Sequence, residues 1–581
     1  MQTINLPQML SILELKKSYQ SKKLSPEAVC KTIIQRAEAD KEFNIWITPP
    51  SMELIQPYLD QLHDLDPGQA PLWGIPFAIK DNIDLADVPT TAGCAEFTFI
   101  PTEHATTVKR LIEAGAIPVG KTNLDQFATG LVGTRSPYGE TKNALSPDLI
   151  SGGSSSGSAV SVARGLAAFS LGTDTAGSGR VPAALNRLVG FKPSLGAWPI
   201  KGVVPACASL DCVTVFANSL SDAMLVDEVV RGFDENDAWS RQLKRQKNAI
   251  PEKVLLLKDQ PEFFGPFAAE YQQAWDAALQ RIRSLSIPIE YIDGSYLLEA
   301  ASILYEGPWV AERWSDLGSF ITSNHQAVFP VTETVLRNGA NPVYDAAAVF
   351  NAIHKLQGFK QKAHQQLKNA VLIMPTSGGT WTREQVRENP IETNRKMGLY
   401  TNHCNLLDLC AVDVPSNDAA FNLPFGLTLF SGYENEHLIS GLADLFLNGT
   451  RSSKTNTTTL LAVCGLHMRG YPLEKQMTDH GAKFVCQTKT AAKYKMIRLS
   501  SLPAKPGLIR ENNSGTAIEI ELWKMPLSEL GAFATLIPSP LGLGKVELED
   551  GSEVLGFVCE GFAALEAEDI SYSGGWRYLP S

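Results

Sequence analysis

The sequence predicts an α/β fold over about residues 1–447, followed by a small β-rich α+β domain. In the first part, helical stretches alternate with short apolar runs such as AAFSLGT (167–173), AVLIMPTS (370–377) and GLTLF (426–430). Residues 448–459, NGTRSSKTNTTT, contain no large apolar side chain, which is typical of a flexible linker. From residue 460 the pattern changes to short strand-like runs, including LLAVCGL, KFVCQT, AIEIELW and VLGFVCE. We therefore expect two domains, 1–447 and 460–581, joined by the linker 448–459.

Two predicted helix starts support the α/β pattern. Ser25-Pro26-Glu27 supplies an N-cap, a proline at the first helical position and an early acid ahead of VCKTIIQRAEA. Thr106 is expected to cap the helix TTVKRLIEAGA (106–116), which Gly115 ends before the strand-like IPVG (117–120). A helix followed directly by a strand is the order that a layered α/β architecture requires.

Composition limits the classes of partner and the cellular compartment. A formal net charge of -11 disfavours a nucleic-acid partner, and an anionic substrate would need a local arginine or lysine in its site. No apolar segment approaches the roughly 20 residues of a membrane span, and residues 1–20 lack the pattern of a signal peptide. The nine cysteines are scattered without a CxxC pair, so we expect a cytoplasmic protein. No HExxH or similar histidine cluster occurs, and neither a metal nor another cofactor is expected.

The segment 151–180, SGGSSSGSAVSVARGLAAFSLGTDTAGSGR, is the densest candidate for chemistry. Glycines let the backbone approach a reacting atom, and consecutive N–H groups in such turns can bind an oxyanion. A linker is the alternative interpretation of a Ser/Gly run. Helix-compatible and strand-like sequence follows within the same segment, however, which favours a turn embedded in a folded core.

Two other motif matches, one before this segment and one within it, are misleading. Residues 115–122, GAIPVGKT, fit a phosphate-binding loop, but here a helix precedes the match and the loop itself is the predicted strand. Residues 153–157, GSSSG, fit the nucleophile elbow of α/β-hydrolases, but the preceding NALSPDLIS is a poor strand. An α/β-hydrolase therefore stays a weak alternative.

Five motifs, in order along the chain, resemble those of the amidase signature family. They are GIPFAIKDN (74–82), GKTN (120–123), GGSSSGS (152–158), GTDTAGSGRVPA (172–183) and GFKPS (190–194). In that family the nucleophilic serine lies 24 residues after the serine that follows the double glycine, and Ser178 lies 24 positions after Ser154. The resemblance covers roughly residues 20–445 and implies the family's fold, a mixed central sheet covered by helices.

The resemblance implies a Ser-Ser-Lys triad of Lys80, Ser154 and Ser178. Ser178 would be the nucleophile, and Lys80 would act as its base once burial lowers the lysine pKa. Ser154, which follows a cis peptide bond in the family, would relay the proton between them. The oxyanion hole would be formed by the backbone N–H groups of Thr175, Ala176, Gly177 and Ser178.

Within the family the chain most resembles the allophanate hydrolases. Tyr305 and Arg313, in LYEGPWVAER, look like the pair that holds the substrate carboxylate, and Gly130, in FATGLVGTRS, looks like a backbone contact. The C-terminal region from about residue 460 is similar to the extra domain of these enzymes, which distantly resembles γ-glutamylcyclotransferase-like folds. In that domain His467, in GLHMRG, would take part in decarboxylating the first product.

The resemblance implies hydrolysis of the terminal amide of allophanate through an acyl-enzyme on Ser178, releasing ammonia and N-carboxycarbamate during urea degradation. It also implies a homodimer and a functional link to a separate urea carboxylase. Three alternatives stay open. These are another amidase of the family, such as a malonamidase, the transamidating component that acts on mischarged tRNA, and a catalytically inactive scaffold.

Overall fold

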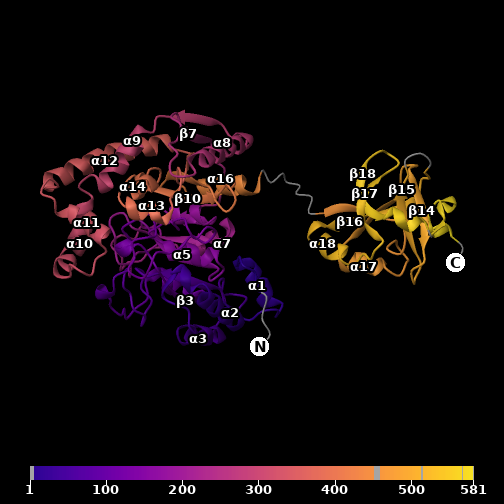
Figure 1. Ribbon diagram of the computed structural model, residues 1–581, viewed down its shortest axis with the longest axis horizontal. Helices are drawn as coiled ribbons and strands as arrows, with labels where there is room; N and C mark the ends of the chain where they lie inside the picture. The colour runs from indigo at the N-terminus through magenta and orange to yellow at the C-terminus, as the bar shows by residue number, and fades with distance from the viewer. Residues whose placement is uncertain (1–5, 450–457, 512–514, 566, 580–581) are drawn as a thin grey trace. The chain divides into compact units, whose positions relative to one another are not determined.

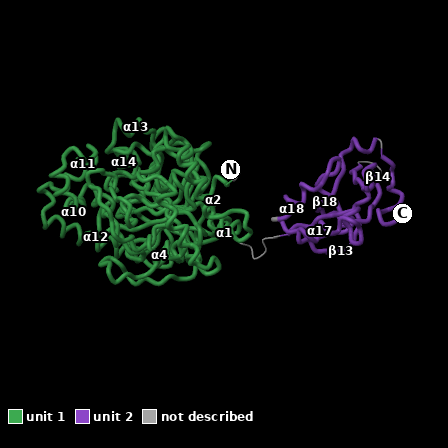
Figure 2. The backbone as a smooth tube through the Cα atoms, turned by 90° about the horizontal axis from the view of Figure 1, so that it is seen from below, with its two compact units in different colours: residues 1–450 green, residues 451–581 purple. Residues whose placement is uncertain are grey.

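The computed structural model describes residues 6–449, 458–511, 515–565 and 567–579 (Figure 1). The chain divides into two compact units, Met1–Thr450 (unit 1) and Arg451–Ser581 (unit 2), which Figure 2 shows in different colours. Most of the expected linker 448–459 falls on residues 450–457, which lie outside the described residues. Its ends belong to regular elements, because Asn448 ends helix α16 and Thr458 begins strand β12.

Unit 1 is built on one mixed sheet of eleven strands in the order β1-β3-β2-β4-β6-β5-β10-β11-β9-β7-β8. The strands are β1 (Trp46–Thr48), β2 (Pro76–Lys80), β3 (Ile117–Thr122), β4 (Phe169–Asp174), β5 (Val189–Lys192), β6 (Cys212–Ala217), β7 (Lys253–Leu257), β8 (Ile289–Ile292), β9 (Ala370–Pro375), β10 (Leu409–Pro415) and β11 (Gly426–Gly432). Strand β2 runs parallel to β3 and β4, and β7 runs parallel to β8 and β9. The other neighbours are antiparallel, so the predicted mixed α/β sheet is confirmed.

The described part of unit 1 also contains sixteen α-helices, several of which pack directly on this sheet. They are α1 (Ile12–Gln20), α2 (Pro26–Ala39), α3 (Met52–Gln61), α4 (Thr106–Glu113), α5 (Ser156–Ala163), α6 (Val181–Leu185), α7 (Leu220–Val230), α8 (Ala268–Ser284), α9 (Ser295–Tyr305), α10 (Val310–Ser323), α11 (Pro330–Arg337), α12 (Ala346–Gln366), α13 (Arg383–Glu388), α14 (Glu392–Met397), α15 (His403–Leu406) and α16 (Glu436–Asn448). Within unit 1, α1 to α3 lie at one end and α8, α9 and α12 at the other (Figure 1). Among the described residues, no helix is both long and apolar enough to cross a membrane.

The central strands are buried on both faces. Every residue of β2, β3, β4, β6, β9 and β11 is buried, and the rings of Phe77 and Phe169 stack across β2 and β4 with centroids 5.3 Å apart. A strand covered by helices on both sides needs apolar side chains in both directions. This burial explains why these strands are rich in apolar residues, without the strict alternation of a half-exposed strand.

The two predicted helix starts have different outcomes. At α2 the Ser25 hydroxyl accepts the Ala28 N–H at 3.2 Å, so this cap is confirmed. At α4 the predicted cap is wrong, because Ala105 is the N-cap and the Thr106 hydroxyl donates to Asp234 at 2.6 Å. The following segment is strand β3, which excludes a phosphate-binding loop there.

Unit 2 consists of a five-stranded sheet, in the order β13-β16-β12-β18-β17, and a three-stranded sheet, β15-β14-β19. Its elements are β12 (Thr458–Val463), α17 (Glu474–Asp479), β13 (Lys483–Lys489), β14 (Tyr494–Leu499), β15 (Lys505–Arg510), β16 (Glu519–Pro526), α18 (Leu527–Ala534), β17 (Leu541–Glu547), β18 (Glu553–Cys559) and β19 (Glu568–Asp569). Along β16, Ile520 and Leu522 join one small core while Trp523 and Met525 join another. The predicted β-rich character of this region is confirmed.

Candidate active site

Strands β2 and β4 bring the main candidate residues to one edge of the sheet. The two strands are parallel neighbours, so their carboxyl ends, Lys80 and Asp174, lie on the same edge. The loop with Ser178 follows Asp174 directly, and Ser154 lies just before helix α5. Residues that are far apart in the sequence are therefore brought together by the sheet topology.

A continuous hydrogen-bond chain links the three predicted triad residues. The Lys80 Nζ donates to the Ser154 Oγ at 2.8 Å, and the Ser154 Oγ donates to the Ser178 Oγ at 2.9 Å. A second bond, from Lys80 Nζ to the Thr173 Oγ1 at 2.7 Å, fixes the lysine. Lys80 and Ser154 are fully buried, and Ser178 is 4% exposed. A proton can therefore pass between Ser178 and Lys80 through one intervening hydroxyl.

Burial lowers the pKa of Lys80 from 10.5 to about 7. Desolvation disfavours the ammonium form and is the largest cause, while the nearby carboxylates of Asp125, Asp211 and Asp174 oppose it. The guanidinium of Arg313 lowers this pKa further. Both protonation states of the lysine are consequently accessible near neutral pH, which is what a group that accepts and then returns a proton requires.

The segment around Ser154 is packed against Asp125. The Gly153–Ser154 peptide bond is cis, as the family resemblance implied. A Cβ on Gly153 would lie 2.1 Å from the Asp125 Oδ2, so only glycine fits there. The Asp125 N–H donates to the Ser154 carbonyl at 3.0 Å, and its carboxylate accepts backbone N–H groups of Val132, Gly133 and Arg135. Asp125 thus connects the Ser154 turn to the loop that carries Gly130.

The loop that carries Ser178 is held by a buried ion pair. The Asp174 carboxylate accepts hydrogen bonds from the Nε of Arg180 at 2.9 Å and from a terminal nitrogen of Arg180 at 3.0 Å. It also accepts the Gly179 N–H at 3.0 Å. Burial alone would raise the pKa of Asp174, but the pair with Arg180 outweighs it and the pKa is lowered. The carboxylate therefore stays charged and keeps the loop in one conformation.

The expected set of oxyanion donors needs one correction, at Gly177. Its N–H donates to the Asp174 Oδ1 at 2.7 Å and is therefore not free to bind an oxyanion. No acceptor is found among the described residues for the backbone N–H groups of Thr175, Ala176 and Ser178. Three of the four expected donors are therefore available to a ligand.

The structure brings together the three predicted substrate contacts. Tyr305 ends α9, and its hydroxyl accepts from a terminal nitrogen of Arg313, on α10, at 3.3 Å. The other terminal nitrogen of Arg313 donates to the Thr129 Oγ1 at 3.0 Å, and Gly130 is the next residue. Arg313 is only 1% exposed. A buried guanidinium beside a phenol is a suitable receptor for a carboxylate.

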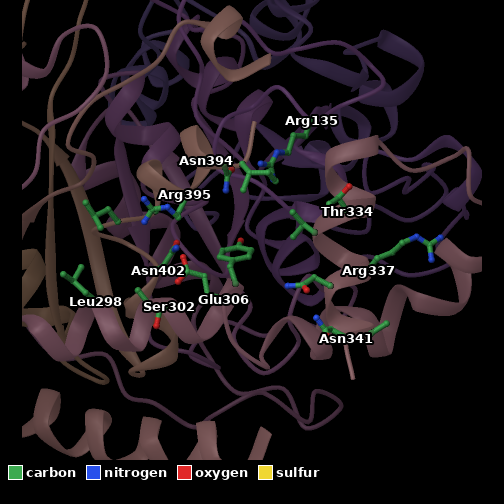
Figure 3. Close-up of a pocket in the computed structure, with 18 residues that line it drawn as sticks. Arg135, Leu298, Ser302, Glu306, Thr334, Arg337, Asn341, Asn394, Arg395 and Asn402 are labelled. Atoms are coloured by element: carbon green, nitrogen blue, oxygen red, sulfur yellow. The ribbon is translucent and has the colours of Figure 1, made fainter. Parts of the chain in front are cut away.

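A cavity of about 900 Å³ adjoins this receptor (Figure 3). Tyr305 lines it together with Arg135, Asn394 and Asn402. The Asn394 side chain accepts the Leu131 N–H at 2.7 Å, so the loop after Gly130 forms part of the boundary. Tyr305 therefore belongs to both the cavity wall and the receptor, whereas Lys80, Ser154 and Ser178 do not line this cavity.

Comparison with known proteins identifies the family. Residues 28–439 match the family model described as Amidase. The chain belongs to the amidase family. Residues 459–580 match a second model, described as Allophanate hydrolase C-terminal domain.

Two amidase-family relatives match along most of this chain. The urea amidolyases of Saccharomyces cerevisiae and Lachancea kluyveri are 39% and 40% identical over 92% and 88% of the chain. The chain spans only about a third of their length, 31% and 30%. Among solved structures, Kluyveromyces lactis allophanate hydrolase matches with a TM-score of 0.72 and 36% identity, covering 98% of this chain and 99% of that one. A glutamyl-tRNA(Gln) amidotransferase component of Methanosarcina acetivorans is 41% identical over only 35% of this chain and 43% of its own.

His467 lies in unit 2, which matches the second family model. Its Nε2 is 2.9 Å from the Gln476 Oε1, and its ring stacks on Phe557 with centroids 4.8 Å apart. Burial lowers the pKa of His467 and so favours the neutral form of the ring. His467 and Lys505 line a cavity of about 150 Å³.

Sequence reasoning missed several residues that shape the amidase site of unit 1. Thr173, Asp174 and Arg180 lie inside the quoted block GTDTAGSGRVPA, and Thr129 and Arg135 lie inside FATGLVGTRS. The sequence signal for these residues was therefore their position inside the same motifs that contain the triad and the substrate contacts. The partners of these side chains depend on tertiary contacts, such as the one between Arg313 and Thr129, which are 184 positions apart.

Proposed function

We propose that this chain is an allophanate hydrolase, an amidohydrolase acting on a small amide that carries a carboxylate. The observation that carries the proposal is the buried Lys80–Ser154–Ser178 hydrogen-bond chain, with Arg313 and Tyr305 close by. The similarity to allophanate hydrolase and urea amidolyase over nearly the whole chain supports this choice over a tRNA-dependent amidotransferase, whose likeness covers a smaller part.

In the proposed mechanism, uncharged Lys80 takes the Ser178 proton through Ser154 while the Ser178 Oγ attacks the terminal amide carbonyl. The N–H groups of Thr175, Ala176 and Ser178 stabilise the oxyanion, each by about 3 kcal/mol. The proton returns through Ser154 to the departing nitrogen, and ammonia leaves. Water then attacks the acyl-enzyme with the same relay as base, which releases N-carboxycarbamate and restores Ser178.

Arg313 and Tyr305 bind the substrate carboxylate, with the Gly130 backbone alongside. A protein of net charge -11 repels an anion, and the fixed positive charge of Arg313 offsets this repulsion in the site. The guanidinium also favours the neutral form of Lys80, since it lowers the lysine pKa. The receptor therefore contributes both to specificity and to the fraction of Lys80 that is uncharged and able to accept a proton.

We propose residues 1–447 as the amidase signature catalytic domain, 448–459 as the linker and 460–581 as a domain that promotes decarboxylation of N-carboxycarbamate. His467 takes part in this second step, because its ring is half-buried, burial lowers its pKa, and it lines a small cavity together with Lys505. Decay of N-carboxycarbamate is measured with wild-type protein and with His467→Ala. Slower decay with the variant supports the role, and an unchanged rate removes it.

The enzyme is proposed to work in the cytosol as a homodimer, functionally linked to a urea carboxylase. All nine cysteines are free thiols, which suits a reducing compartment. Light scattering after gel filtration checks the dimer, and a single-chain mass would contradict it.

A panel of allophanate, malonamate, malonamide and biuret tests the proposed substrate class. Malonamate and malonamide differ in one group, a carboxylate against an amide, so they isolate the receptor. We expect kcat/KM for the anion to exceed that for the neutral amide by at least about a hundredfold, because a buried Arg–carboxylate contact is lost. Equal turnover of the two would leave a general amidase. Absence of fluorophosphonate labelling at Ser178 would instead favour an inactive scaffold.

A further inference from the structure

Arg135 is a buried arginine without a carboxylate partner among the described residues. It is 2% exposed, and its terminal nitrogens donate to the carbonyls of Thr129 at 3.1 Å and Pro390 at 2.6 Å. Its Nε–H also lacks a partner in the described part of the chain. It lines the 900 Å³ cavity that Tyr305 lines. A buried cation is costly unless a negative group compensates it.

Arg135 and Arg313 meet at a single residue, Thr129. Arg313 donates to the Thr129 side-chain oxygen at 3.0 Å, and Arg135 donates to the Thr129 carbonyl at 3.1 Å. The Arg313 Nε also lacks a partner among the described residues. Two guanidinium groups this close repel each other, and the repulsion lowers the pKa of Arg135, although burial is the larger cause.

Two other arginines of unit 1, whose side chains are 0% and 5% exposed, do contact a carboxylate. Arg180 contacts Asp174 at 2.9 Å, and Arg231 contacts Asp227 at 2.9 Å. No ion pair found in the described part of the chain includes Arg135 or Arg313. Asp125 partly balances Arg135 through space, but the oxygens of its carboxylate are occupied by three backbone N–H groups. Asp211 and Glu312 likewise act on Arg313 only through space. The lack of a carboxylate in direct contact with either guanidinium, among the described residues, points to an anionic ligand.

We propose that Arg135 is a second cationic determinant of specificity for the substrate carboxylate. It acts as a positioning residue: it holds Thr129, which holds Arg313, and its charge adds to the field that favours an anion in the receptor. Holding two neutral carbonyls alone would need only a neutral donor, whereas a permanent charge here has a role only if an anion binds. This inference rests on the proposed function, since it assumes a carboxylated substrate.

Arg337 provides a matched control in the same cavity. It lines that cavity, but it is more than a third exposed and contacts Glu333 on its own helix at 2.7 Å. In Figure 3, Arg135 and Arg337 lie apart from each other among the lining residues. Arg135→Gln and Arg337→Gln each remove one positive charge from the cavity wall. A difference in malonate affinity between the two variants therefore reflects the position of Arg135 and not the loss of charge alone.

The experiment measures calorimetric binding of malonate, a dicarboxylate of similar length to allophanate, to the full chain carrying Ser178→Ala. Adding Arg135→Gln should weaken malonate binding by at least about tenfold, and Arg337→Gln by less than about twofold. With Ser178 intact, Arg135→Gln should raise KM for malonamate by a similar factor. It should change kcat/KM for neutral malonamide by less than about threefold, because a general structural defect would lower both.

Two further variants keep the inference testable if Arg135→Gln does not fold. Arg135→Lys keeps the charge and should retain more malonate affinity than Thr129→Val, which releases Arg313. If the Ser178→Ala protein binds malonate equally well with and without Arg135→Gln, the inference is overturned and the proposed function still stands. Failure of the Ser178→Ala protein to bind malonate at all, together with equal turnover of malonamate and malonamide by the intact enzyme, would overturn both.

Discussion

The pH dependence of Ser178 reactivity follows from the burial of Lys80. The fall of the lysine pKa from 10.5 to about 7 corresponds to about 5 kcal/mol. At pH 7 it raises the uncharged fraction from a few in ten thousand to about one half, a gain on the order of a thousandfold. Since only uncharged Lys80 can accept the Ser178 proton, reactivity should rise with pH and level off above about 7.

Fluorophosphonate labelling of Ser178 measures this directly, because the neutral reagent does not use the carboxylate receptor. The labelling rate is followed from about pH 5 to about pH 9 and should rise about tenfold per pH unit on the acid side. Lys80→Arg is the control, because a guanidinium stays protonated over this range. Its labelling should be slow and flat. A wild-type rate that keeps rising beyond pH 9, or a variant with the wild-type profile, would refute the role of Lys80.

Two further predictions concern the loop that carries Ser178. A Cβ on Gly177, at φ +139°, would lie 2.3 Å from the Thr401 hydroxyl; Gly177→Ala should therefore lower kcat/KM by at least about a hundredfold. The control is Gly358→Ala, at an exposed position of α12 where a Cβ would have nothing within 4 Å. It should leave kcat/KM unchanged and stabilise the fold by about 0.5–1 kcal/mol. Equal kinetic losses in the two variants would contradict this account. Arg180→Met leaves Asp174 buried and uncompensated and should cost about 3–5 kcal/mol in urea denaturation; a loss below about 1 kcal/mol would show that the pair does not hold the loop.

Much of the fold could be predicted because its strands are buried on both faces. Strand β9 stands out as an unbroken apolar run, and β4 and β11 as short runs rich in apolar residues between helical segments, so the α/β class followed from the pattern alone. The approach of Lys80 to Ser178 followed from the motif resemblance and not from periodicity. It depends on β2 pairing with β4 across some 90 intervening residues.

The parts that could not be predicted depend on backbone direction and tertiary partners. Gly177 has the residue type of an oxyanion donor, but the Asp174 carboxylate takes its N–H. Thr106 is a good cap by residue type, but the N-cap of α4 is one residue earlier and the hydroxyl binds Asp234. Nothing in the sequence indicates that Arg135 is buried, because its partners include the Pro390 carbonyl, 255 positions away.

Ammonia release from allophanate, compared between the wild-type chain and Ser178→Ala, tests the central claim most directly. The account predicts steady turnover by the wild type. It predicts a loss of at least about ten-thousandfold in kcat for the variant, because the Ser178 hydroxyl, which the Ser154 hydroxyl contacts, is the nucleophile. Ser178→Ala turning over allophanate within about tenfold of the wild type would contradict the account.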